Sequence, residues 1–166
     1  MDTLWEELTL GLGSGAQAER VLLRMVVAVL LGGLVGIQRE QAGKPAGVRT
    51  HMLVCLATAV VVLTCSGIGM AYDAQSRVIQ GIVTGIGFIG AGSILKLSEE
   101  RDIQGLTTAA GLWLTAAIGI ACGVGTIGIA LITAVVTVIL LALAGVIETR
   151  EAEKRKRAAE KQKNDS

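Results

Sequence analysis

The stretch Arg77–Leu97, RVIQGIVTGIGFIGAGSILKL, is long enough to cross a membrane and has glycine at positions 81, 85, 87, 90 and 92. About 20 predominantly apolar residues span the ~30 Å of hydrocarbon in a bilayer. Glycine is a poor helix former in water, but in lipid its missing side chain lets another backbone approach closely. This stretch therefore predicts tight helix packing, a break in the helix, or a site lined by backbone.

The composition of the whole chain supports a membrane location. Of its 166 residues, 52% are hydrophobic and 17% are charged, whereas soluble domains have about 25% charged residues. Only 2% are aromatic, so we expect no stacking surface for nucleic acid and no nucleic-acid partner. The three cysteines all lie in apolar runs and form no CxxC pair, which favours small buried hydrophobes over metal or redox ligands.

Five apolar segments have the length of membrane spans. We place them at about 21–37, 52–71, 78–97, 105–122 and 124–147. The last two are separated by almost nothing, and glycines mark a very tight turn there. The sequence thus predicts an all-α, polytopic membrane protein of about five transmembrane helices with glycine-mediated packing.

Glycine pairs four residues apart indicate where helices pack closely. Gly81 and Gly85 form such a pair in the third span, Gly32 and Gly36 in the first, and Gly119 and Gly123 in the fourth. We therefore expect Gly85→Leu to separate packed helices and destroy assembly. The segment GIGFIG also matches the dinucleotide pattern GxGxxG, but it lacks the preceding strand and the βαβ frame, so we reject a nucleotide site.

The distribution of Lys and Arg predicts the orientation. With five spans, loops 38–51 and 96–104 and the C-terminal tail share one side and hold twelve of the fifteen basic residues. The positive-inside rule places that side in the cytoplasm and the N-terminus outside. We expect an extracytoplasmic segment at 1–20, a transmembrane domain at 21–147, and a charged helical tail at 148–166 that continues the last span and lies in solvent, on anionic lipid or against a partner.

A polar ridge runs along the third span. Arg77, Gln80, Thr84 and Phe88 recur at helical spacing. Polar side chains are expensive in lipid, so this ridge should face protein or a wet cavity. Four glycines that follow Thr84 in the same span are also candidate functional residues: Gly85, Gly87, Gly90 and Gly92.

Two carboxylates are candidates for contact with Mg²⁺. Asp73 precedes the third span and Glu40 follows the first. Mg²⁺ keeps several waters, so one or two carboxylates are enough to bind it. A local ion pair between Asp73 and Arg77 is the alternative.

The loop GIQREQAGKPAGVRTH concentrates polar residues at the predicted cytoplasmic edge. Its candidates are Arg39, Glu40, Arg49, Thr50 and His51. Pairing of Arg with Glu could tie two helix ends together, and the alternative is a surface for an ion or a partner. A lone histidine is more often a hydrogen-bonded residue than a metal ligand.

The fourth span opens with Thr107 and Thr108, whose hydroxyls can cap a helix or bond across helices. Trp113 lies mid-span, where we expect it to fill space left by glycines on neighbouring helices. The chain shows no convincing set of nucleophile, base and acid, so we do not expect an enzyme.

In combination, these motifs resemble the membrane domain of the MgtC/SapB family. The segments that carry the likeness are GGLVGIQREQAGKPAGVRTH, Asp73 with RVIQGIVTGIGFIGAGSIL, and GLTTAAGLWLTAAIGIACGVG. The resemblance implies a bacterial inner-membrane protein linked to magnesium limitation and, in pathogens, to survival inside macrophages. Many relatives continue into a soluble C-terminal domain, whereas this sequence ends in a short charged segment, so we expect the functions of the membrane part.

The family's characteristic positions fall on the candidate residues named above. The resemblance implies regulators that bind membrane partners, including the proton-translocating ATP synthase. Our first hypothesis is such a regulator in magnesium homeostasis. The alternatives are a Mg²⁺ transporter or channel, and a structural homo-oligomer in the lipid bilayer.

Overall fold

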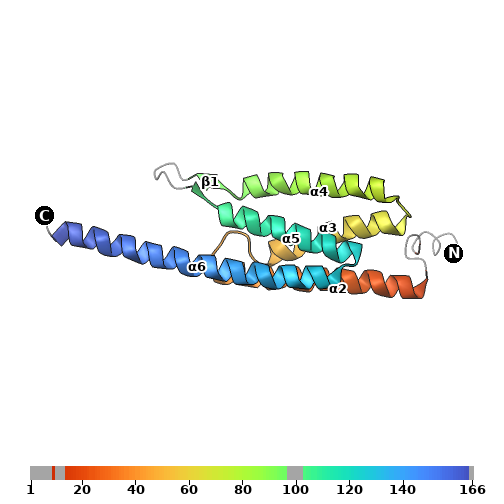
Figure 1. Cartoon of the computed structure of the whole chain (residues 1–166), viewed down its shortest axis with the longest axis horizontal. Coiled ribbons are helices and arrows are strands. Elements are labelled where there is room, and N and C mark those ends of the chain that lie inside the picture. Colours follow the sequence, from red (N-terminus) through yellow and green to blue (C-terminus); the bar gives the residue numbers. More distant parts are fainter. Residues whose placement is uncertain (1–8, 10–13, 97–102, 165–166) are drawn as a thin grey trace.

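The computed structural model describes residue 9, residues 14–96 and residues 103–164, and in these ranges five long helices dominate (Figure 1). Their bounds are α2 Gly15–Gln41, α3 Val48–Gly67, α4 Tyr72–Gly92, α5 Leu106–Val124 and α6 Ile127–Asn164. Two short antiparallel strands, β1 Leu95–Lys96 and β2 Ile103–Gln104, join α4 to α5. The predicted helices are all present, and the predicted tail continues the last span as part of α6.

Four of the described helices are long and apolar enough to cross a membrane: α2, α3, α5 and residues 127–147 of α6. Helix α4 is less apolar because Asp73, Gln75, Arg77 and Gln80 occupy its first half. It nevertheless lies alongside α5 over much of that helix's length (Figure 1). The predicted all-α polytopic membrane protein is therefore confirmed.

Glycines bring α2, α3 and α5 into backbone contact. A Cβ atom added at Gly32 would lie 2.7 Å from the His51 carbonyl oxygen, and one at Gly36 would lie 2.5 Å from the Val48 Cα. On α5, a Cβ at Gly119 would overlap Thr58 and the Cys55 backbone of α3. The predicted close packing of the first and fourth spans is thus confirmed, and α3 is the helix that both of them meet.

The predicted close packing at Gly81 and Gly85 of the third span is wrong within this chain. Nothing lies within 4 Å of a Cβ added at either glycine, or at Gly87 or Gly92. Gly90 alone approaches another helix, with Ala109 of α5 3.6 Å from its added Cβ. Helix α4 packs through its isoleucine side, so Gly85 is left at an open groove between α3 and α4. Gly85→Leu is therefore not expected to disrupt the fold of one chain.

Helix α4 is continuous through its five glycines, which excludes a break in the third span. It begins six residues earlier than the predicted boundary at 78, and Asp73 lies in its first turn. A carboxylate there is favourable, because the N-terminus of a helix carries partial positive charge. The helix ends at Gly92, where the Ser93 amide donates to the Ile89 and Gly90 carbonyls.

The tight turn predicted between the last two spans is present at Gly125 and Thr126. Gly125 has φ 97°, a left-handed conformation that glycine adopts without steric cost. Its amide donates to the carbonyls of Ala121 and Cys122, and the Thr126 amide also donates to Ala121. The chain therefore reverses within two residues, and α5 and α6 lie antiparallel.

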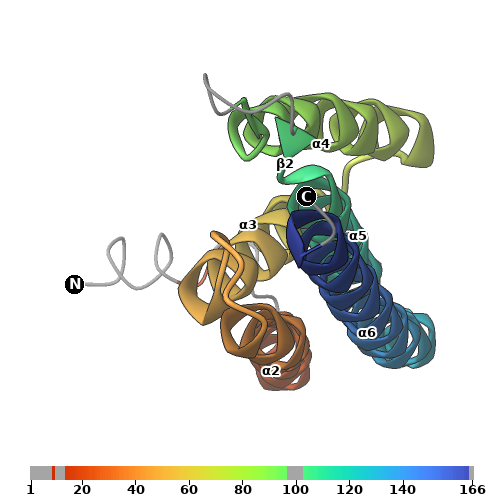
Figure 2. The same ribbon diagram turned by 90° about the vertical axis from the view of Figure 1, so that its left-hand side faces the viewer.

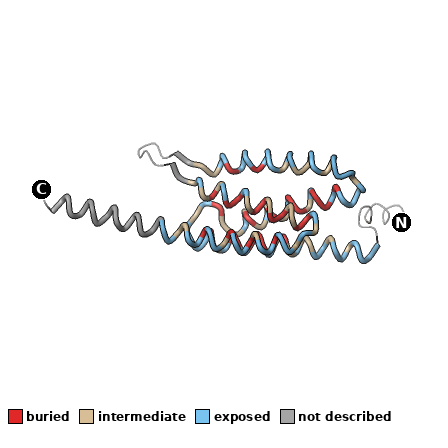
Figure 3. The backbone as a smooth tube through the Cα atoms, viewed as in Figure 1, coloured by how far each residue is buried: buried red, intermediate tan, exposed pale blue. Residues whose placement is uncertain are grey.

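The apolar core lies among α2, α3, α5 and α6, and α4 contributes nothing to its main cluster. Its members are Ala28, Leu31, Val35, Cys55, Ala59, Ile118, Cys122, Ala130, Ala134 and Leu141. Figure 3 shows the buried positions along these helices and mostly exposed ones along α4. All three cysteines are free and buried, as predicted for small hydrophobes.

Candidate functional site

A buried polar cluster joins three helices, and Arg39 is its charged member. Arg39 lies in the last turn of α2 and is 2% exposed. Its Nη2 donates a hydrogen bond of 3.0 Å to Oγ1 of Thr108, which is 1% exposed in the first turn of α5. A buried cation is costly unless its donors are satisfied, so this contact constrains how α2 and α5 meet.

His51 lies in the same interior, on the first turn of α3, and is completely buried. Its Nδ1 is 2.6 Å from Thr115 Oγ1, and the Thr115 hydroxyl donates to the Gly111 carbonyl at 2.9 Å. A hydroxyl has one proton to donate. His51 Nδ1 is therefore the donor to Thr115, and Nε2 points away from that bond.

His51 Nε2 is buried and forms no hydrogen bond within the described ranges. Gly111 leaves room beside the ring, because an added Cβ would be 3.7 Å from His51 Cε1. The predicted hydrogen-bonded histidine is thus confirmed, although it lies inside the bundle. With Nδ1 donating, a neutral ring keeps a lone pair on Nε2 that can accept a proton or a hydrogen bond.

Two threonines of the interior escaped the sequence analysis. Thr58 of α3 donates to carbonyls of its own helix and lies 3.2 Å from the Ala116 carbonyl of α5. Thr115 anchors His51. The available signal was periodicity, since Thr108, Gly111, Thr115 and Gly119 share one face of α5 at spacings of three and four residues.

The remaining candidates of the α2–α3 loop lie at the surface of this cluster. Glu40 Oε2 accepts a hydrogen bond of 3.0 Å from the Val48 amide, and this carboxylate lies against Gly47. It therefore ties the end of α2 to the start of α3 through the backbone of α3. Arg49 is exposed and Thr50 is half-buried in the first turn of α3. The structure thus brings the five loop candidates together, with Arg39 and His51 inside and the others at the rim.

The polar ridge of the third span does not face the interior, contrary to prediction. Arg77, Gln80 and Thr84 are exposed on α4, and Phe88 is 85% exposed. The Thr84 hydroxyl donates only to the Gln80 carbonyl one turn earlier, at 2.9 Å. The ridge lies outside because α4 presents its isoleucines, which bury more apolar area, to α5 and α3.

The two proposed Mg²⁺ carboxylates are far apart in the fold. Glu40 is near the C-terminus of α2, whereas Asp73 is in the first turn of α4, at the other end of the bundle (Figure 1). They cannot ligate one ion together. In the ranges that the structure describes, no group of three or more His, Cys, Asp or Glu side chains could hold a metal.

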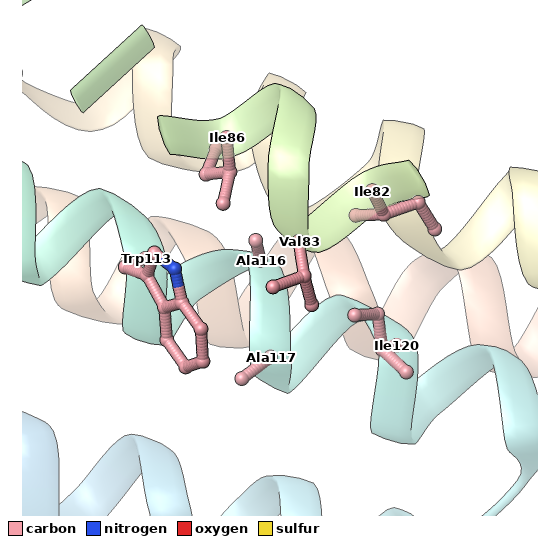
Figure 4. Close-up of a pocket in the computed structure, with 7 residues that line it drawn as sticks. All are labelled: Ile82, Val83, Ile86, Trp113, Ala116, Ala117 and Ile120. Atoms are coloured by element: carbon pink, nitrogen blue, oxygen red, sulfur yellow. The ribbon is translucent and has the colours of Figure 1, made fainter. Parts of the chain in front are cut away.

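Trp113 lies between α5 and α4 and is 45% exposed. It lines an apolar recess of about 130 Å³ with Ile82, Val83 and Ile86 of α4 (Figure 4). The expectation that it fills space beside glycines is wrong, because its neighbours on α4 are branched aliphatic side chains. Thr107 is half-buried beside Thr108 at the start of α5.

Arg24 of α2 makes a further polar contact with α5, which the sequence analysis missed. Its Nη1 donates to the Gly123 carbonyl at 3.1 Å, and its guanidinium lies against Gly125. Cations at the C-terminus of a helix satisfy its free carbonyls and its partial negative charge. Arg24 therefore fixes the far end of α5 to α2, opposite the cluster of Arg39 and His51.

The model of the MgtC family matches residues 25–150, which include most of α2 and all of α3, α4 and α5. The chain belongs to the MgtC family. The likeness to the MgtC/SapB membrane domain inferred from the motifs is thereby confirmed. No solved structure matches the chain.

Three relatives illustrate the range of this family. Protein SrpB of Synechococcus elongatus is 40% identical over 64% of this chain and 65% of its own length. The "Putative magnesium transporter YhiD" of Escherichia coli K12 is 37% identical over 72% of this chain and 58% of its own. Protein MgtC of Salmonella typhimurium LT2 is 42% identical over 63% of this chain and 43% of its own length. The chain thus matches between 43% and 65% of the length of these relatives.

Proposed function

We propose that this protein is a non-enzymatic regulator of magnesium homeostasis that acts through contacts with other membrane proteins. The magnesium link is supported by membership of the MgtC family and by the name of the related YhiD. By the resemblance noted above, its role belongs to adaptation to low Mg²⁺ and, in a pathogen, to virulence. The proton-translocating ATP synthase is the membrane partner that we would test first.

The observation that carries the regulator proposal is the filling of the bundle interior. Helices α2, α3 and α5 meet backbone to backbone at Gly32, Gly36 and Gly119. Two pairs of buried polar side chains bond across these helices, Arg39 with Thr108 and His51 with Thr115. An interior packed in this way favours a docking role over a pore, because hydrated Mg²⁺ needs a wide polar path.

A Mg²⁺ transporter or channel is the second candidate. It is favoured by the name of YhiD and by the exposed carboxylate of Asp73, on the same helix face as Gln80 and Thr84. A path for the ion would then lie along the outside of α4, between this chain and another. Mg²⁺ would be substrate in that case, held through its own waters.

We further propose that the protein lies in the bacterial inner membrane with its C-terminus in the cytoplasm. The α2–α3 loop, strands β1 and β2, and the end of α6 lie toward one end of the helices (Figure 1). Those regions carry most of the Lys and Arg residues of the chain. Reporter fusions after residue 164 test this, since a fused alkaline phosphatase should be inactive and a fused fluorescent protein bright.

A paired experiment separates the two functions. We expect the chain to restore growth of a deletion strain at low Mg²⁺, yet to give no Mg²⁺ flux in liposomes under a membrane potential. We also expect a membrane-protein partner to co-purify with it from that strain. Flux that depends on the protein and disappears in Asp73→Asn, but not in the control Glu19→Gln, would reject the regulator and establish transport.

A further inference from the structure

Helix α4 turns its polar side away from the rest of the bundle. Its buried residues, Ile86 and Gly90, point toward α3 and α5. The opposite side repeats every three or four residues, and all its members are exposed: Asp73, Ser76, Arg77, Gln80, Gly81, Thr84, Gly87 and Phe88. We call these eight residues the outer face of α4. In the end-on view of Figure 2, α4 lies at the periphery, on the far side of α5 from α6.

A helix that faces lipid needs apolar side chains on its exposed side, whereas the exposed side of α4 is polar. Helix α6 exposes Leu131, Ile132 and Leu140, which suit hydrocarbon. The outer face of α4 exposes Gln80, whose side chain has no hydrogen bond within the described part of the chain. Polar groups at membrane depth are stable only when they meet protein or water. The outer face therefore has to be covered by something other than this chain and lipid.

We propose that the outer face of α4 binds the same face of a second copy of this chain, in a parallel, two-fold symmetric pair of α4 helices. A two-fold interface has to complement itself, because the same patch is used twice. Asp73 and Arg77 are exposed, opposite in charge and one turn apart on this face. In a parallel two-fold pair residues of equal number lie at the same level, so Asp73 of each copy reaches one turn along the other helix to Arg77, and this ion pair forms twice.

The rest of the face supports the same partner. Gly81 and Gly87 have nothing within 4 Å of an added Cβ, so a second helix can approach their backbone closely. Gln80 and Thr84 lie between the charged end and Phe88, where their side chains can bond across the pair. Another membrane protein would need to supply matching charges of both signs, whereas a second copy has them by symmetry. The proposal holds whether the protein is a regulator or a transporter.

Cysteine cross-linking in native membranes tests the contact directly. The natural cysteines are buried, so the unmodified chain is expected to give no cross-link. Thr84→Cys should give a disulfide-linked dimer as its main species under mild oxidation. The control Ile132→Cys, on an α6 residue that is 64% exposed, should remain monomeric. A monomer in both variants, with a monomer mass in lipid nanodiscs, would overturn the proposal.

A charge exchange identifies the partner as a second copy. Arg77→Asp alone and Asp73→Arg alone should each lower the dimer fraction about tenfold, since like charges then meet in a poorly hydrated contact. The double variant Asp73→Arg with Arg77→Asp should restore it, because both copies change together. Failure of the double variant to restore the Thr84→Cys cross-link, with an unchanged melting temperature, would overturn the pairing of Asp73 with Arg77 between two copies.

Discussion

Helices α3 and α4 are adjacent in sequence, 20 and 21 residues long, yet they place their polar groups oppositely. In α3, His51 and Thr58 point into the bundle and bond to α5. In α4, Gln80 and Thr84 point away from it. The difference teaches that a glycine or a polar residue in a span does not by itself say which way it faces, because the neighbouring helix decides that.

The sharpest test of this comparison is to enlarge one glycine in each region. Gly119→Leu should prevent folding, because its side chain would occupy the place of Thr58 and the Cys55 backbone. Overpacking of this kind costs about 3 kcal/mol or more. Gly85→Leu should leave the melting temperature of the single chain nearly unchanged, since its side chain would enter the open groove between α3 and α4.

Expression level and thermal unfolding in detergent measure both variants. An equal loss of folded protein in Gly119→Leu and Gly85→Leu would contradict the conclusion that the α5 glycine is closely packed and the α4 glycine is not. A milder variant, Gly119→Ala, keeps the test interpretable if the leucine variant is not recovered.

Removing the buried histidine should have the next largest effect. His51→Ala leaves a cavity beside Gly111 and deprives Thr115 of its partner, so we expect a loss of about 2 kcal/mol in unfolding free energy. The matched change on α4, Gln80→Ala, should alter the stability of the monomer by less than about 0.5 kcal/mol. Unfolding of monomeric protein in detergent measures both variants. A larger loss of stability in Gln80→Ala than in His51→Ala would refute the conclusion that His51 is buried in the bundle and Gln80 is exposed.

Two threonines of similar shape give a finer comparison. Thr115→Val keeps the volume but leaves His51 Nδ1 without its acceptor, which should cost about 1 kcal/mol. Thr84→Val loses only a bond to its own helix and should cost a few tenths at most, about the uncertainty of such measurements. Melting curves of the two variants beside the parent protein check the ordering.

Changes at the helix ends are expected to cost somewhat less than Thr115→Val. Glu40→Gln removes a charged acceptor from the Val48 amide at the start of α3, which should cost about 0.5–1 kcal/mol. Asp73→Asn, in the exposed first turn of α4, should cost less, because no hydrogen bond to its carboxylate is present in the described structure. High salt should reduce the Glu40 effect, and an effect independent of salt would argue against a helix-dipole contribution.

Much of the fold was predictable because the solvent dictates it. A membrane demands long apolar segments with internally bonded backbones, so helices and their number follow from hydropathy. The family likeness was predictable from the order of the motifs. The boundary of α4 was missed by six residues, since its first two turns contain Asp73 and Arg77 and do not resemble a membrane span.

The sequence by itself determined that the chain is a helical membrane protein, that glycines mediate its packing, and that Arg39, Thr108 and His51 are among its candidate polar residues. Only the tertiary structure decided which glycines are in contact, that Thr115 holds His51, and that the glycine-rich stretch Arg77–Leu97 turns its polar side outward. The physical reason is that periodicity defines the faces of a helix but not their partners. Which face is buried depends on the shape and bonding of helices distant in sequence, and here the isoleucine side of α4 fits α5 better than its polar side does.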